Sequence, residues 1–96
     1  MDITKVVDGS KVTFQLAGDL DITTAPELQA AVDEVIDGAE SLVIDFEQCP
    51  YLSSAGIGVL LKSFKAMKKK AGDFAVVNMN DYIREVLEIT GLDALF

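Results

Sequence analysis

The 96-residue chain contains no histidine and only one cysteine, Cys49. Without histidine, the Ser-His and Cys-His pairs that activate many enzymatic nucleophiles are impossible. A zinc site needs several Cys or His ligands, and Cys49 alone cannot supply them. One cysteine also cannot form an internal disulfide, so a reducing cytoplasm is the expected location. We expect Cys49 to be a small buried apolar side chain.

Basic residues are few, and no apolar run is long. Eight Lys and Arg residues stand against sixteen Asp and Glu residues, which gives a net charge of −8. That balance disfavours binding to nucleic acid, because such binding depends on neutralising phosphates. No apolar run approaches the ~20 residues that cross a bilayer, so we expect no direct membrane insertion. The one basic run, Lys68 to Lys70, follows a predicted helix, where cations complement the helix dipole. A phosphate- or lipid-binding patch is the alternative.

The glycine and lysine patterns of nucleotide-binding loops are also absent. Two carboxylate pairs, Asp19 with Asp21 and Asp45 with Glu47, lie at predicted strand ends and are candidates for weak Mg²⁺ binding. Acidic residues at strand exits are more often solvated surface. We therefore expect no cofactor and no metal, and no pair of catalytic groups that would make the chain an enzyme.

The order of the elements follows from hydrophobic spacing and turn residues. Residues 3–7 and 11–16 are predicted strands, and Asp8-Gly9-Ser10 between them is typical of a hairpin. Later strands at 41–46 and 74–77 alternate with helices, which favours parallel pairing with right-handed crossovers. We predict one α/β domain over residues 1–96. It should have a mixed four- to five-stranded sheet, an N-terminal antiparallel hairpin and about three packed helices.

Several details of these elements can be predicted as well. Thr24 and Glu27 have the spacing of a capping box at the start of the first helix. The apolar run Leu42-Val43-Ile44 is typical of a strand covered on both faces. The last helix should begin near residue 80 or 81 and end at Thr90-Gly91, and residues 92–96 should form a tail that docks on the sheet edge. The inward residues of the last helix are predicted to be Tyr82, Ile83, Val86, Leu87 and Ile89. The long helix should bury Ile57, Leu60, Leu61, Phe64 and Met67.

The front of the long helix carries small residues where a plain core helix would carry bulky ones. Its segment Ser53-Ser54-Ala55-Gly56-Ile57-Gly58 leaves hydroxyl and backbone N–H groups accessible. A helix N-terminus favours negative charge, so a serine there has two candidate roles. It can cap the helix, or it can carry a phosphate.

Three segments together resemble a known family: Leu16 to Asp21, Leu42 to Phe46 and Leu52 to Leu61. They resemble the STAS domain and, more narrowly, the stand-alone bacterial anti-sigma-factor antagonists. The resemblance implies a mixed sheet flanked by helices and a partner-switching function. The unmodified protein binds an anti-sigma factor that is also a serine kinase, which releases the sigma factor. Phosphorylation of one serine ends that binding, and a serine phosphatase would reset the system.

The resemblance also carries individual residues. Alignment on Gly56 places Ser54 at the phosphoacceptor position, and Ser53, where the family often has aspartate, becomes the second choice. Asp21 matches the aspartate of the family's Gly-x-Leu-Asp segment. We therefore expect a partner-binding surface with Ile57 as an apolar anchor if its side chain points outward. Its predicted members are Asp21, Ser53, Ser54, Gly56, Ile57 and Gly58.

A second function is compatible with the same sequence. An accessory STAS subunit, for example of a membrane transporter, would act as a scaffold without phosphorylation. A genuine enzyme ranks behind both, because no acid–base or nucleophile pair emerges from the residues.

Overall fold

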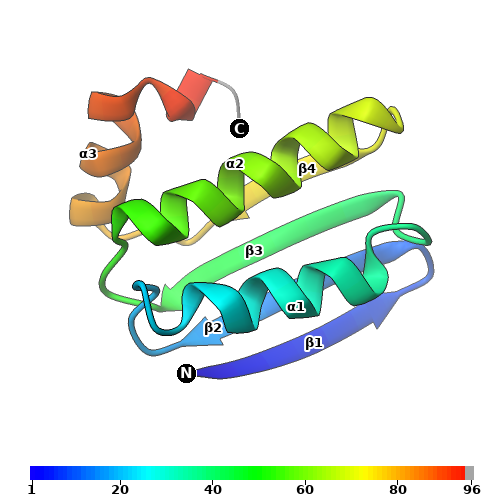
Figure 1. Ribbon diagram of the computed structural model, residues 1–96, viewed down its shortest axis with the longest axis horizontal. Helices are drawn as coiled ribbons and strands as arrows, with labels where there is room; N and C mark the ends of the chain where they lie inside the picture. The colour runs from blue at the N-terminus through cyan, green and yellow to red at the C-terminus, as the bar shows by residue number, and fades with distance from the viewer. Residues whose placement is uncertain (95–96) are drawn as a thin grey trace.

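A computed structural model describes residues 1–94 of the chain as a mixed four-stranded sheet with three α-helices (Figure 1). The strands lie in the order β1-β2-β3-β4; the β1–β2 pair is antiparallel and the other two pairs are parallel. The predicted fold class is confirmed. The elements are β1 Asp2–Asp8, β2 Lys11–Ala17, α1 Ala25–Val35, β3 Ser41–Gln48, α2 Ser54–Lys69, β4 Asp73–Val77, α3 Asp81–Thr90 and the 3₁₀ helix η1 Leu92–Ala94.

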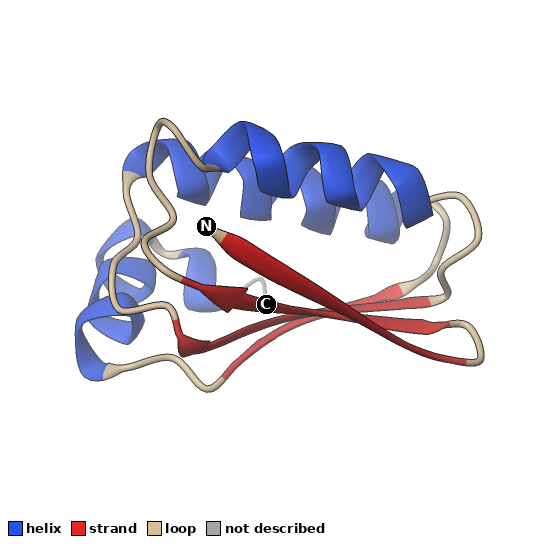
Figure 2. Ribbon diagram, turned by 90° about the horizontal axis from the view of Figure 1, so that it is seen from below, coloured by secondary structure: helices blue, strands red, loops and turns tan. Residues whose placement is uncertain are grey.

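The helices α1 and α2 cover one face of the sheet, and α3 lies off its end (Figure 2). Alternation places the apolar residues of β2 and β3 on the helix-covered face, where they are buried: Val12, Phe14, Leu16, Leu42, Ile44 and Phe46. Val43 points to the opposite face and is only half-buried. The expectation that this strand is covered on both faces is therefore wrong. No helix within residues 1–94 has the length and apolar character needed to span a membrane.

The buried side of α2 differs from the predicted one. It consists of Gly56, Val59, Leu60, Ser63 and Met67. Leu60 and Met67 were predicted, whereas Ile57, Leu61 and Phe64 are only half-buried. Small residues let the helix approach its neighbours closely at Gly56, and the Ser63 hydroxyl is satisfied by the Val59 carbonyl oxygen at 2.8 Å. The prediction considered only large apolar residues, and it therefore did not include Gly56 and Ser63 among the buried residues.

The last helix begins and ends as predicted. Asn80 caps α3 by accepting a hydrogen bond from the Ile83 N–H at 2.8 Å, and Gly91 follows it in the left-handed region. Of its predicted inward residues, Ile83 and Leu87 are buried, but Tyr82 and Ile89 are exposed. The tail forms η1, which packs against α3. The prediction that it reaches the sheet edge concerns in part residues 95 and 96, which lie outside the described residues.

Lys70, the last lysine of the basic run, stabilises the end of a different helix from the one expected. Its ammonium group donates hydrogen bonds to the carbonyl oxygens of Ile36 and Asp37, at 2.7 and 2.8 Å. These carbonyls lie at the C-terminal end of α1, which is the negative end of that helix. Lys70 therefore complements α1, while Lys68 and Lys69 lie in the last turn of α2.

Candidate functional site

Two loops lie side by side at the carboxyl ends of β2 and β3, and each carries a predicted site residue. The Leu20 N–H donates to the Tyr51 carbonyl oxygen and the Ser53 N–H to the Leu20 carbonyl oxygen, both at 3.0 Å. Leu20 and Leu52 form an isolated parallel bridge and are buried beneath the loops. Leu20, which precedes Asp21, and Ser53, which precedes Ser54, are therefore hydrogen-bonded to each other. The fold thus brings together residues that are far apart in the sequence.

Ser54 is the first residue of α2, and it is exposed. Its hydroxyl makes no hydrogen bond within residues 1–94. The first backbone bond of the helix runs from the Ile57 N–H to the Ser53 carbonyl oxygen, at 3.0 Å. The N–H groups before it have no acceptor within the helix, and the first turn holds no acidic residue. An uncrowded hydroxyl therefore lies at the positive end of a helix dipole.

Ser53 has the backbone conformation of an N-cap, with φ −97° and ψ 174°, but its side chain makes no capping hydrogen bond. Its Oγ atom is buried and has no partner. Neither serine therefore caps α2, which removes the capping role proposed from composition. A buried Oγ also cannot receive a phosphate without a local rearrangement, so Ser54 is the more accessible of the two predicted acceptors.

Asp21 is held by the loop that follows β2. Its Oδ1 accepts hydrogen bonds from the Thr23 hydroxyl at 2.7 Å, the Thr23 N–H at 2.9 Å and the Thr24 N–H at 3.1 Å. These bonds, led by the Thr23 hydroxyl, lower the pKa of Asp21, with the Thr24 N–H next in importance. The carboxylate therefore stays ionised in a loop that is bonded, through Leu20, to Ser53 at the start of α2.

The same loop overturns the predicted capping box. Thr24 is the N-cap of α1 but makes no capping bond. Its hydroxyl instead donates to the Asp19 carbonyl oxygen at 2.7 Å and accepts from the Asp21 N–H at 2.8 Å. Thr24 therefore closes the loop around Asp21, and Glu27 has no role in a cap.

The two glycines at the front of α2 face in opposite directions. A Cβ at Gly56 would lie 2.6 Å from Leu52 Cδ1 and 2.7 Å from Leu20 Cγ, so Gly56 serves the packing of the domain itself. The prediction that Gly56 offers surface to a partner is wrong. Gly58 is exposed, and a Cβ there would meet nothing within 4 Å. Ile57 is half-buried against the core and does not point outward as an anchor.

Sequence reasoning missed an exposed apolar side chain next to Asp21. Ile22 is 78% exposed. The signal was present, because an isoleucine between an aspartate and a threonine in a loop has no strand or helix to bury it. Ile22, rather than Ile57, is the apolar residue available at this site.

An aromatic pair on the other side of Ser54 was also missed. The rings of Tyr51 and Tyr82 stack with centroids 5.8 Å apart and an interplanar angle of 12°, and both side chains are more than 40% exposed. The Tyr82 hydroxyl donates to the Leu52 carbonyl oxygen at 3.4 Å, and Asn80 Nδ2 donates to the Pro50 carbonyl oxygen at 3.0 Å. The start of α3 therefore holds the loop that leads into Ser54.

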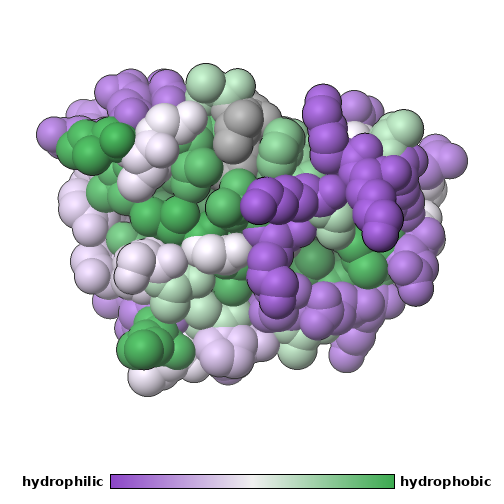
Figure 3. Space-filling view, turned by 45° about the horizontal axis from the view of Figure 1, so that its top comes forward, coloured by the Kyte–Doolittle hydropathy of each residue, from purple (hydrophilic) through white to green (hydrophobic). Residues whose placement is uncertain are grey.

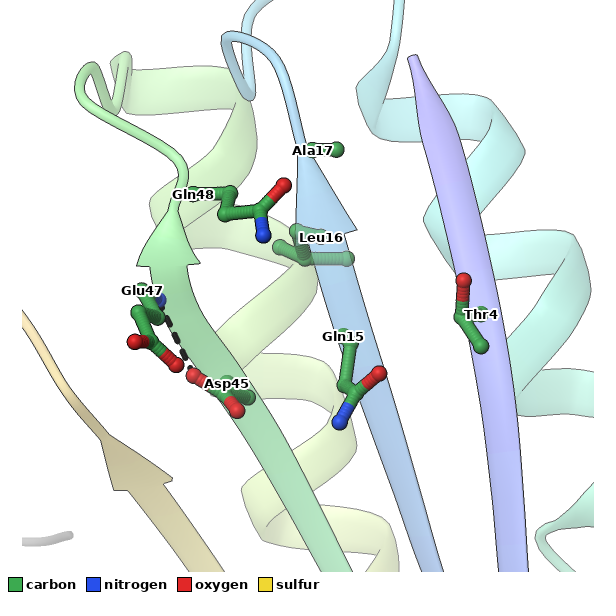
Figure 4. Close-up of a pocket in the computed structure, with 7 residues that line it drawn as sticks. All are labelled: Thr4, Gln15, Leu16, Ala17, Asp45, Glu47 and Gln48. Atoms are coloured by element: carbon green, nitrogen blue, oxygen red, sulfur yellow. Dashed lines mark hydrogen bonds between the residues drawn. The ribbon is translucent and has the colours of Figure 1, made fainter.

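The remaining candidates do not join this site. Cys49 is buried as expected, and burial raises the pKa of its thiol. Asp45 and Glu47 line a hollow on the uncovered face of the sheet, together with Thr4, Gln15 and Gln48 (Figure 4). The Asp45 carboxylate there accepts from the Glu47 N–H and from Asn78 Nδ2. Within residues 1–94 no three side chains of the metal-binding types come together.

Comparison with known proteins places this geometry in a family. Residues 2–96 match the model of the STAS domain. The anti-sigma-B factor antagonist of Listeria monocytogenes is 31% identical over 87 residues, which cover 88% of this chain and 75% of that protein. The protein of the same description from Staphylococcus aureus is 29% identical over 82 residues, which cover 84% and 76%.

Solved structures give the same result. An anti-sigma factor antagonist from Mycobacterium paratuberculosis superposes with a TM-score of 0.88 and 29% identity, covering 99% of this chain and 81% of that one. The anti-sigma factor antagonist SpoIIAA in its unphosphorylated form has the same fold, with a TM-score of 0.85 at 22% identity over 95% and 82% of the two chains. The match of the domain model over nearly the whole chain, with these relatives, shows that the chain belongs to the STAS domain family.

Proposed function

We propose that this chain is an anti-sigma-factor antagonist. In its unmodified form it binds an anti-sigma factor that is also a serine kinase, and the sigma factor is released. Phosphorylation of Ser54 ends the binding, and a serine phosphatase restores it. Its similarity to proteins described as anti-sigma-B factor antagonists supports this function. We place this activity in the cytoplasm, without a catalytic or nucleic-acid-binding role of its own.

The observation that carries the proposal is the contrast between the two adjacent serines. Ser54 presents an exposed, unbonded hydroxyl at a helix N-terminus, whereas the Ser53 Oγ is buried. A kinase needs access to the hydroxyl it modifies, and it needs room for the phosphoryl group beyond it. Ser54 meets both needs, and the Ser53 hydroxyl meets neither.

Electrostatics explains how a phosphate at Ser54 would act as a switch. It adds about −1.5 to −2 charges, which the positive end of α2 tolerates in the free domain. Inside a closed interface the same phosphate would be desolvated next to the loop that carries the ionised Asp21. Such a mismatch costs several kcal/mol, and each ~1.4 kcal/mol is a tenfold change in affinity. The complex would therefore dissociate without unfolding of the domain.

The first experiment is phosphorylation by a candidate anti-sigma factor kinase with ATP, followed by mass spectrometry of the intact chain and its peptides. We expect one phosphate, on Ser54. Ser53→Ala is the matched control, because it removes the neighbouring hydroxyl and leaves the acceptor in place. A phosphate that remains after Ser54→Ala would refute this assignment.

Binding to the same anti-sigma factor gives the second measurement. We expect Ser54→Ala to bind as the wild-type chain does, and Ser54→Asp to bind at least about tenfold more weakly because it places a negative charge in the interface. Equal binding of both variants, together with no phosphorylation, would instead favour the accessory scaffold role.

A further inference from the structure

Gly58 lies within α2, but the packing of the domain does not require a glycine at this position. Glycine inside a helix is about 0.5–1 kcal/mol less favourable than alanine, so its presence usually has a reason. At Gly56 the reason is the contact with Leu20 and Leu52. At Gly58 a Cβ would meet no atom within 4 Å. Packing within the domain therefore does not account for Gly58, whereas close approach of a partner at this position would.

Gly58 lies in an apolar groove between α1 and α2. The α1 side contributes Ala25 and Pro26, and the α2 side contributes small or apolar residues around Gly58. The exposed Ile22 and the lysine Lys62 also line it. The full lining is Ile22, Ala25, Pro26, Gln29, Ala55, Gly58, Val59 and Lys62. The small residues Ala25, Ala55 and Gly58 in this lining let the backbone of a partner come close.

The charge on α2 indicates what the groove would bind. This helix carries four lysines and no acidic residue, although the chain as a whole has a net charge of −8. None of the four has an ion-pair partner within the described part of the chain. Lys62 lines the groove, and Lys69 follows seven residues later on the same side of the helix. Figure 3 shows hydrophilic residues gathered over the C-terminal part of α2.

From these observations we propose that the groove between α1 and α2 receives a segment of the anti-sigma factor that presents an apolar side chain followed by acidic side chains. The apolar side chain lies against Ile22, Ala25 and Gly58, and the carboxylates lie against Lys62 and Lys69. This inference rests on the proposed function for the identity of the partner. The chemistry of the segment follows from the groove itself.

The proposal also predicts whether phosphorylation of Ser54 weakens or strengthens binding of the partner. Ser54 lies one turn before Gly58 on the exposed side of α2, so a phosphate there stands at the end of the groove. An acidic segment in the groove would be repelled by that phosphate. A basic segment would be attracted, and phosphorylation would then strengthen the complex. Release on phosphorylation is therefore the outcome expected with an acidic partner segment, whose repulsion adds to the cost of desolvating the phosphate.

The test uses two synthetic helical peptides of about four turns, so it does not depend on finding the kinase. Both carry a leucine stripe; one borders it with glutamates, and the other has lysine at each of those positions. Each is titrated into the isotope-labelled chain while backbone amide shifts are followed by NMR. We expect the acidic peptide to change the backbone amide chemical shifts of Ile22, Ala55, Gly58 and Lys62. The lysine peptide should leave them unchanged.

Three variants sharpen the result. The double variant Lys62→Gln with Lys69→Gln should lower the affinity for the acidic peptide by about two- to fivefold per lysine. It should also reduce the dependence of binding on salt. Lys68→Gln is the matched control, because Lys68 lies on the other side of α2 beside Phe64 and Gly72. Gly58→Ala should weaken binding about tenfold, because its methyl group occupies the contact.

Several outcomes would overturn the proposal. Equal shifts with both peptides would show that charge does not select the occupant. Shifts that appear on raising the protein concentration alone would make a second copy the occupant. Binding of phosphatidylserine vesicles through Lys62 and Lys69, without a response to the acidic peptide, would make a membrane surface the occupant. Failure of Ser54 phosphorylation in the earlier experiment would refute the proposed function and leave this peptide result standing.

Discussion

Replacing either glycine of α2 by alanine should change the stability of the domain, with opposite signs at Gly56 and Gly58. Alanine at Gly58 meets no atom within 4 Å and removes a helix glycine, so we expect about 0.5–1 kcal/mol of stabilisation. Alanine at Gly56 would place a methyl group 2.6 and 2.7 Å from atoms of two leucines that are at most 2% exposed. Overpacking of a core costs about 1–3 kcal/mol, which exceeds the gain in helix propensity.

Thermal unfolding followed by circular dichroism measures both effects. For a domain of this size, 1 kcal/mol corresponds to a shift in Tm of roughly 4–8 °C. Gly58→Ala should therefore melt a few degrees above the wild-type chain, and Gly56→Ala several degrees below it. Two shifts of the same sign would show that the assignment of one inward and one outward glycine is mistaken. Urea unfolding at constant m-value would check that the native state is unchanged.

Three further predictions concern single side chains. Lys70→Met removes two hydrogen bonds to carbonyl oxygens at the end of α1 and should lower the free energy of unfolding in urea by about 0.5–1 kcal/mol. Ser53→Ala removes a buried hydroxyl that has no partner and should be neutral or stabilising in the same assay, since an unsatisfied polar group costs about 1–3 kcal/mol. The pKa of Asp21 is lowered in the folded protein, so its stabilising effect is fully present above the ordinary value of 3.8 and is lost as the pH falls through the lower folded value. Wild-type and Asp21→Asn unfolding curves should therefore differ near neutral pH and converge in acid.

Each of these predictions has a control variant or a result that would contradict it. Lys69→Met alters a lysine one position earlier that makes no hydrogen bond to α1, and it should leave stability nearly unchanged. A loss for Ser53→Ala equal to that expected for a cap, ~1 kcal/mol, would indicate that Ser53 caps α2 after all. Thr23→Val removes the largest cause of the lowered pKa of Asp21 and should raise that pKa toward its ordinary value, which an NMR titration of the carboxyl carbon would detect.

Much of the fold could be predicted because local patterns determine it. The alternation of Val12, Phe14 and Leu16 gives the inner face of β2, and the structure buries all three. Asn80 and Gly91 bound α3 through a side-chain cap and a left-handed residue, both of which depend on residue type alone. At both ends of α3, where a few neighbouring residues set the outcome, the sequence was sufficient.

The orientation of small and polar residues depended on packing between distant segments. Gly56 faces inward because the loop carrying Leu20, more than thirty residues away, lies beneath it. Glycine carries no weight in a hydrophobic pattern, so the true buried side of α2 was not predictable from spacing. Lys70 likewise binds the end of α1 across more than thirty residues. Ile57 was consequently chosen as the exposed apolar residue in place of Ile22.

In the proposed switch, α2 separates two kinds of residue by helical spacing. The buried residues on one side of the helix pack it onto the domain, and among them Gly56 has no room for a Cβ. Ser54 and Gly58 lie on the other side, where added atoms meet solvent or a partner. Since one turn of helix relates Ser54 to Gly58, a phosphate on the first changes the surface that includes the second. The core contacts of Gly56 would be untouched, so we expect phosphorylation of Ser54 to alter binding while the free energy of folding changes little.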